Sequence, residues 1–376
     1  MNEEKKIKTL VFARRIVLVA VIVYIAVFFV WEFSSLSVDG IRRSFFDIKQ
    51  ALSGEVSPGS VVFSEDENGV SEVYADGIVR VTQTSATVYS KEGNRYSSFK
   101  ISLVSPAVRT GKSKFLLFDR GGRNVYLCNS FGVISRYESQ DNVINAGISE
   151  SGKVFIIKEK YGYKAELVVF NGDLDENDCF IWDSAEAYMT DAVFADKNTL
   201  TVTGIVPTSD SFNTVVYRID VKNGKKLSSF VFEDQTAVSV FSRGAGDATV
   251  LTTSSVIRVG EDDTRAVYSF DGLGVDVFDQ NGRYIVLACV ARVSTQTDEI
   301  VFIDADGNVR FTKEFVGVRD VAAVGDECYV LADGTVYAFD IYGNEKSKTD
   351  VPDAYGIRAD NSAVFCVSAE KAVCIG

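Results

Sequence analysis

The sequence predicts an all-β fold: a single β-propeller, preceded by an N-terminal transmembrane helix and a short stalk helix. Two series of turns recur along the chain with a common spacing of roughly 35–50 residues, which is the length of a propeller blade. Each turn adjoins a short run of β-branched and aromatic residues, typical of strands. A long uncharged run near the N-terminus predicts the membrane helix.

The first turn series is clearest between Phe302 and Phe311, where an acidic residue and Gly307 separate two apolar runs. Such a turn between alternating hydrophobic residues is a strong hairpin signal. Equivalent turns fall at Gly93, Gly132, Gly172, Gly224, Gly260, Gly307 and Gly343.

A second turn series lies between these, and each of its turns precedes a more hydrophobic run, such as Phe115–Phe118. A nearly continuous apolar run suits a strand that is covered on both faces. The members of this series are Gly77, Gly111, Gly152, Asn198, Gly246, Gly282, Gly325 and Asn361.

Two turn series with a common period imply one four-stranded blade per period. The second series has one more turn than the first, so we expect eight blades, with seven as the alternative count. The eighth unit ends at Ile375, before its outer strand. We expect Val61-Val62-Phe63 to supply that strand and to close the ring, which removes an open sheet edge. The propeller domain is assigned to residues 60–376.

The run from Tyr217 to Leu227 resembles the repeat of quinoprotein-type propellers, in which an aspartate precedes a Gly-Lys turn. The tryptophan that follows in that family is absent, and Phe230 is the nearest aromatic residue. The whole arrangement of basic tail, membrane helix and degenerate propeller resembles an uncharacterised family of membrane-anchored proteins from clostridia-like bacteria. That family has no known activity, so the resemblance transfers no functional residues.

Residues 1–15 form a basic tail, which we expect to be cytoplasmic. The run Ile16–Trp31 contains no charged residue and would form about 24 Å of helix. This is shorter than a hydrocarbon core of ~30 Å, so neighbouring apolar residues extend it, and the transmembrane helix is assigned to residues 16–33. Trp31 and Phe33 would lie in the outer aromatic belt.

The positive charges precede the membrane segment, so the sequence predicts a plasma-membrane protein with a cytoplasmic N-terminus and an extracytoplasmic propeller. A cleaved signal peptide is the alternative, with Ser35-Leu36-Ser37 as a weak cleavage site. The bulky apolar run and the lack of an A-x-A site favour the uncleaved anchor.

Residues 34–59 link the anchor to the propeller and contain a predicted amphipathic helix. Asp39 would cap its start, and Gly54 and Pro58 would end it. We expect this helix to pack under the propeller, to lie on a surface or to bind a partner. Its apolar face consists of Ile41, Phe45, Ile48 and Leu52.

The formal net charge is −13, and the first fifteen residues carry five basic and two acidic side chains, so the remainder carries −16. A domain this acidic repels phosphate backbones, which argues against nucleic acid as a partner. The sequence contains no histidine, which excludes His-based triads and His metal ligands.

The sequence contains six cysteines and no C-x-x-C pair, so it gives no support for a zinc site or a thioredoxin-like motif. Cys289, Cys328 and Cys366 occupy similar places in successive apolar strands, where we expect core packing. A disulfide between Cys366 and Cys374, across a short turn at Glu370, is left open.

Two loops are longer than their turns require. Residues 173–178 begin like a calcium loop but lack the expected Gly and Glu, having Asp178 and Ser184 instead. The other loop is Pro207–Asn213, where Phe212 is either an exposed contact residue or is tucked onto a blade. At Asp304-Ala305-Asp306 the hairpin itself explains the acidic residues. We name no catalytic, cofactor-binding or metal-binding residue and expect no cofactor.

These features predict a non-catalytic binding or scaffold module of the cell envelope, with a protein or a cell-wall component as its partner. The alternative is a degenerate quinoprotein-like or glycan-active propeller enzyme. The lining of the central channel discriminates between them, because several carboxylates enclosed with a basic partner would favour the enzyme.

Overall fold

The computed structural model describes residues 15, 19, 37–53, 59–63, 69–290 and 297–376. The chain divides into two compact units, Met1–Glu55 and Val56–Gly376, and each is described by itself.

The first unit contains the predicted amphipathic helix as α2 (Val38–Ser53). Its apolar residues Phe45, Ile48 and Leu52 are exposed within the described chain. The predicted capping residue is wrong: Ser37, not Asp39, is the cap, because its Oγ accepts a hydrogen bond of 3.0 Å from the N–H of Gly40. Asp39 lies inside the first turn and pairs with Arg43 at 3.4 Å.

The predicted transmembrane helix, residues 16–33, lies outside the described residues except for Val19. In the described part of the chain, no helix is long and apolar enough to cross a membrane.

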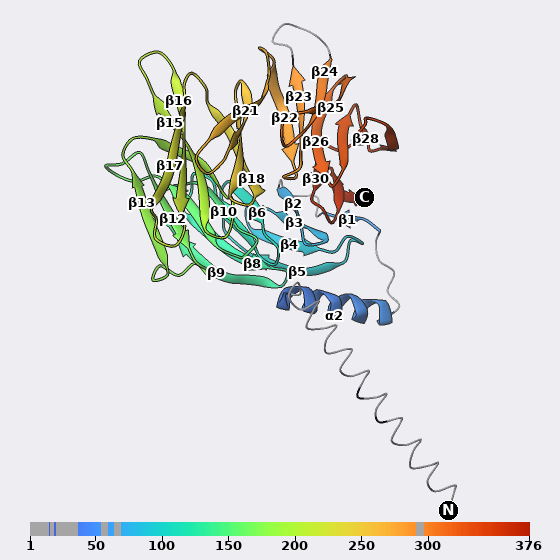
Figure 1. The fold of residues 1–376 in the computed structure, drawn as a ribbon. Coiled ribbons are helices and arrows are strands. Elements are labelled where there is room, and N and C mark those ends of the chain that lie inside the picture. Colours follow the sequence, from blue (N-terminus) through green and yellow to red (C-terminus); the bar gives the residue numbers. More distant parts are fainter. Residues whose placement is uncertain (1–14, 16–18, 20–36, 54–58, 64–68, 291–296) are drawn as a thin grey trace, which may run out of the picture. The chain divides into compact units, whose positions relative to one another are not determined.

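The second unit consists of eight antiparallel four-stranded sheets, the blades (Figure 1). Blades 1 to 4 contain β2 (Val70–Tyr74), β3 (Gly77–Val81), β4 (Ser85–Tyr89) and β5 (Arg95–Lys100); β6 (Pro106–Thr110), β7 (Phe115–Asp119), β8 (Asn124–Asn129) and β9 (Gly132–Glu138); β10 (Val143–Ile148), β11 (Val154–Lys158), β12 (Ala165–Phe170) and β13 (Cys179–Ser184); and β14 (Tyr188–Phe194), β15 (Thr199–Pro207), β16 (Phe212–Asp220) and β17 (Lys226–Phe232).

Blades 5 to 7 follow the same order, with the first strand innermost. They contain β18 (Ala237–Gly244), β19 (Asp247–Thr252), β20 (Ser255–Val259) and β21 (Thr264–Ser269); β22 (Gly274–Gln280), β23 (Tyr284–Val290), β24 (Asp298–Asp304) and β25 (Val309–Phe315); and β26 (Val318–Val324), β27 (Glu327–Ala332), β28 (Thr335–Asp340) and β29 (Glu345–Asp350).

Blade 8 confirms the predicted closure. It contains β30 (Gly356–Ala359), β31 (Val364–Val367) and β32 (Lys371–Cys374), and its outer strand is β1 (Val61–Val62) from the other end of the domain. Val61 lies opposite Ala372 and Val62 opposite Lys371. The N–H of Phe63 continues the pairing with the carbonyl of Glu370 at 2.7 Å. Both turn series and the count of eight blades are therefore confirmed.

Apolar residues fill the spaces between neighbouring blades. Phe365 and Val367 of blade 8 pack with Val73 and Ile78 of blade 1, and the innermost strands β2 and β30 are in contact. Tyr74 and Phe115 join blades 1 and 2 with their ring centroids 4.8 Å apart. Packing of this kind connects the last blade to the first, so the sheets form a closed ring.

Local geometry shows how residues 207–213 are arranged and whether Cys366 and Cys374 are bridged. The segment Pro207–Asn213 is not a long loop: β15 and β16 extend to pair Pro207 with Phe212, and the Phe212 side chain is 55% exposed. All six cysteines are free. Cys366 lies opposite Val373, whereas Cys374 lies opposite Phe365, so the two thiols point to opposite faces of the blade.

Candidate binding site

The innermost strand of each blade has one edge without a strand partner, so its backbone N–H groups need other acceptors. In three places a carboxylate from the preceding blade provides one. Asp191 Oδ2 accepts from the N–H of Val240 at 3.3 Å, Asp279 Oδ2 from that of Ala323 at 2.9 Å, and Asp320 Oδ2 from that of Ile357 at 2.9 Å. These carboxylates join neighbouring blades on the channel side.

Burial shifts the protonation of two of these groups. It raises the pKa of Asp279 to about 7, and the hydrogen bonds from the N–H groups of Ala323 and Gln280 offset only part of that effect. Burial also raises the pKa of Asp191, although Arg109 and backbone donors act in the other direction. The channel thus contains several carboxylates, but these two already accept hydrogen bonds from backbone donors.

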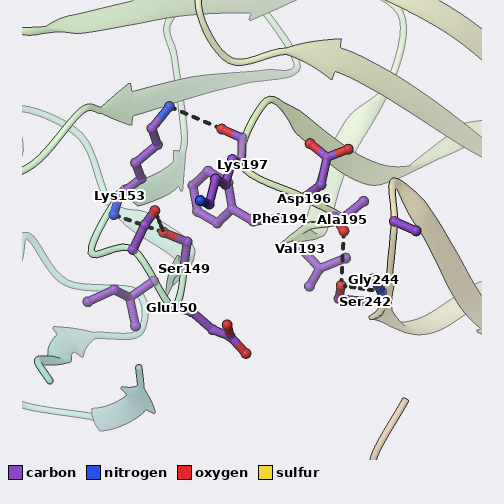
Figure 2. Close-up of a pocket in the computed structure, with 13 residues that line it drawn as sticks. Ser149, Glu150, Lys153, Val193, Phe194, Ala195, Asp196, Lys197, Ser242 and Gly244 are labelled. Carbon is purple, nitrogen blue, oxygen red and sulfur yellow. Dashed lines mark hydrogen bonds between the residues drawn. The ribbon is translucent and has the colours of Figure 1, made fainter. Parts of the chain in front are cut away.

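A cavity with a mixed lining lies over the turns that follow β10, β14 and β18. It has a volume of about 380 Å³, within the usual size range of ligand pockets. We call it the blade 3–5 groove. Its floor is apolar, and its rim carries acidic, basic and hydroxyl side chains; Figure 2 shows Lys153 and Asp196 on opposite sides of Phe194. The floor consists of Ile148, Val193, Phe194 and Ala195, and the charged residues are Glu150, Lys153, Asp196 and Lys197.

Hydrogen bonds hold the central turn of the groove from both sides. Lys153 Nζ of blade 3 donates to the carbonyl of Lys197 at 3.2 Å. On the other side, Ser242 Oγ of blade 5 donates to the carbonyl of Ala195 at 3.3 Å, as Figure 2 shows. Because each bond crosses a blade boundary, the groove is preorganised for a ligand.

A second cavity of about 300 Å³ continues the groove toward the channel and shares Ile148, Val193 and Phe194 with it. Phe155 and Phe241 extend the apolar lining, and Arg109 and Asp191 add one charge of each sign. The combined site can bury one or two apolar side chains of a ligand while its rim pairs with polar or charged groups of either sign.

The acidic turns singled out in the sequence have partners of their own. Asp173 pairs with Lys114 at 2.9 Å, and Asp178 accepts a hydrogen bond from Asn171. Asp304 accepts from the N–H groups of Asp306 and Asn308 and pairs with Arg310. Among the described residues, no group of three or more Cys, Asp or Glu side chains is placed to hold a metal ion.

Sequence reasoning missed the groove and the channel carboxylates. A signal exists for one of these carboxylates, Asp191: Asn145, Asp191 and Ser239 each stand seven residues before a turn of the second series. Each lies just after a bulge in its strand, and Asn145 Nδ2 donates to Asp191 Oδ1 at 2.8 Å. A polar residue repeated at this position would have marked the joints between blades.

The closed ring of eight four-stranded sheets, with a preorganised groove on its turns, defines the protein as an eight-bladed β-propeller. More particularly, the chain belongs to DUF5711, a family of unknown function, which matches residues 54–362. No curated protein matches the chain.

Solved structures of other proteins share the fold. A eukaryotic initiation factor is 11% identical with a TM-score of 0.56, and the match covers 85% of each chain. Sqt1 from Chaetomium thermophilum, bound to the N-terminus of the ribosomal protein L10, is 11% identical with a TM-score of 0.53 over 84% of this chain and 99% of that one. AztD from Citrobacter koseri is 8% identical with a TM-score of 0.51 over 76% and 86%. These likenesses concern the fold alone.

Proposed function

We propose that this protein is a non-catalytic binding module, anchored in the plasma membrane, whose extracytoplasmic propeller holds a peptide segment of a partner protein in the blade 3–5 groove. The observation that carries the proposal is the groove itself. An apolar floor with hydroxyl groups and charges of both signs on its rim suits a peptide, which offers apolar side chains between polar backbone groups. A polyanionic ligand would be repelled by the carboxylates of Glu150 and Asp196 on the rim.

The membrane location rests on the sequence. Five basic residues precede the uncharged run Ile16–Trp31, which predicts a cytoplasmic N-terminus. The family match begins at residue 54, after this run. Protease added to intact cells should therefore remove the propeller, and a protected propeller would contradict this topology.

The choice of a peptide ligand has support from one structural neighbour. Sqt1 is a protein of the same fold that was solved bound to the N-terminus of another protein. A protein of this fold can therefore hold a terminal peptide of another protein. The absence of histidine from the sequence also removes the commonest general base from the site.

Site-specific cross-linking tests the groove. A photo-activatable residue at Ser151 or Ala245, both on the rim, should form a covalent adduct with one protein partner in intact cells. The same residue at Tyr342, an exposed position on blade 7, is the matched control and should not. Adducts with cell-wall glycan alone, or equal adducts from all three sites, would contradict the proposal.

A groove variant then separates binding from stability. Val193→Glu introduces a charge into the apolar floor and should lower the yield of the adduct about tenfold. Val309→Glu on blade 6, where the valine is already exposed, is the control. Because Val193 also packs against the buried residues Val240 and Val250, the melting temperature of each variant is measured together with the yield, and only a loss of adduct from folded protein counts. An unchanged yield for Val193→Glu would show that the partner binds elsewhere.

A glycan-active enzyme is the second candidate. Burial raises the pKa of Asp279 to about 7, and the nearby carboxylates of Asp320 and Glu72 add to this rise. A carboxyl of this kind can act as a general acid. This candidate predicts that the purified protein releases soluble fragments from peptidoglycan and that Asp279→Asn abolishes the release. If the wild-type protein releases no fragments, the enzyme candidate is excluded.

A further inference from the structure

A third cavity of about 200 Å³ lies between blades 1, 2 and 8, beside the first residues of β2 and β6. Three arginines, Arg109, Arg120 and Arg358, and one carboxylate, Glu72, line it together with the hydroxyl residues Ser71 and Ser105. This concentration of positive charge is unusual in a chain whose formal net charge is −13. We call this cavity the arginine pocket.

The three guanidinium groups differ in their partners. Arg358 is held in place, because its Nη1 lies 2.9 Å from Asp320 Oδ2 and its Nε donates to the carbonyl of Ser71 at 3.1 Å. Arg109 and Arg120 are exposed and form no ion pair with any other described residue. Asp320 pairs with Arg358, and Arg109 also faces Asp191 outside the pocket. Within the lining itself, three guanidinium groups stand against the single carboxylate of Glu72, so the lining keeps a surplus positive charge.

The protonation state of the Glu72 carboxyl determines which class of anion the pocket can bind. Glu72 faces Arg358 and Asp360 from blade 8 and Arg109 from blade 2, and its Oε1 accepts a long hydrogen bond of 3.4 Å from the N–H of Val73. Burial raises the pKa of Glu72, and the two arginines offset this only in part. A proton from solvent can therefore reside on Glu72 and be donated to an anionic oxygen beside it.

We propose that the arginine pocket binds a small monocarboxylate through Arg109 and Arg120, with Glu72 protonated and donating a hydrogen bond to the bound carboxylate. Guanidinium groups form paired hydrogen bonds with planar carboxylates. A single negative charge matches the surplus of the pocket, whereas a phosphate dianion would exceed it and would face Glu72, Asp320 and Asp360. This inference does not depend on the peptide-binding function of the blade 3–5 groove.

Calorimetric titration of the full-length protein in detergent tests the pocket, with propionate as the probe. Chloride at equal ionic strength is the control for screening. Propionate should bind with a Kd of about 1 mM or tighter, and inorganic phosphate should bind more weakly. Absent propionate binding, or tighter binding of phosphate, would overturn the proposal.

Variants connect the binding to the named residues. Arg120→Gln should weaken propionate binding about tenfold, whereas Arg95→Gln, which removes an exposed arginine from an outer strand of blade 1, should not change it. Because Arg109 also lines the cavity that continues the groove, Arg120→Gln is the cleaner test. Equal affinities for the two variants would contradict the assignment.

The role of Glu72 has its own signature. Propionate stays ionised above about pH 6, so a change in its affinity at higher pH reports on the protein. The wild-type affinity should fall as the pH rises and Glu72 loses the proton that it shares with the ligand. Glu72→Gln should lose most of this dependence, whereas Asp279→Asn, which removes the nearby carboxyl with a pKa of about 7, should keep it. A pH-independent wild type, or a Glu72→Gln variant that keeps the slope, would overturn this part of the proposal.

Discussion

Gly307 illustrates how one residue serves both a turn and the contact between two blades. Its φ is +88°, a conformation that side chains with a Cβ adopt at a penalty. A Cβ atom at this position would lie 1.9 Å from the carbonyl oxygen of Val267, on the outer strand β21 of the preceding blade. The hairpin at residue 307 was predicted from its sequence, but this close approach was not.

Gly307→Ala should therefore destabilise the protein by about 3 kcal/mol or more, since backbone strain and a steric clash act together. Gly162→Ala is the matched control: Gly162 also has a positive φ, +84°, but nothing lies within 4 Å of its added Cβ. The free energy of unfolding of this control variant should fall by only about 1 kcal/mol. Chemical denaturation of both variants measures the difference, and equal losses would show that the contact with Val267 is unimportant.

At the scale of one element, the two-residue strand β1 closes the whole ring. Its residues alternate between the two faces of the blade: Val61 is 0% exposed and packs with Phe365 and Val367, whereas Val62 is 64% exposed. Closure thus depends on a short strand with one buried side chain and on its pairing with β32.

Val61→Asp should destabilise the propeller by about 3 kcal/mol or more, because it places an unpaired carboxylate in the apolar contact between blades 8 and 1. Val62→Asp, one residue along the same strand, should stay within about 0.5 kcal/mol of the wild type. Urea denaturation compares the two. Similar stabilities would mean that β1 is dispensable for the folded ring.

For the whole ring, the channel carboxylates couple stability to pH. The pKa of Asp279 is raised by burial from 3.8 to about 7 in the folded protein. Its neutral form is the one that folding favours, so its contribution to stability is complete below about pH 4 and is lost as the pH rises to about 7.

Asp279→Asn keeps an oxygen that can accept from the N–H of Ala323 but cannot ionise. Relative to the wild type, this variant should gain on the order of 3 kcal/mol between about pH 4 and about pH 8. Asp276→Asn, at an exposed position on the same strand, controls for the loss of one charge. Denaturation at several pH values gives the comparison, and parallel pH profiles for the two variants would refute the role of Asp279.

The part of the fold that was predictable came from local patterns. Turns such as those at Gly77 and Gly307 and the apolar runs beside them specify strands that are close in the sequence. The closing strand could be predicted because the eighth unit lacked one strand and Val61-Val62-Phe63 was available. The helix cap was misassigned because both Ser37 and Asp39 are good caps, and only the backbone geometry shows which side chain reaches the N–H of Gly40.

The sequence by itself determined the strands, the number of blades and the way the ring closes. The reason is that each hairpin pairs two segments that are close in the sequence, so a local pattern of turn and apolar residues specifies it. Only the tertiary structure decided that Phe194 and Ser242 line one groove and that Glu72, Arg120 and Arg358 line one pocket. These residues belong to different blades, and ring closure, rather than any local pattern, brings them together.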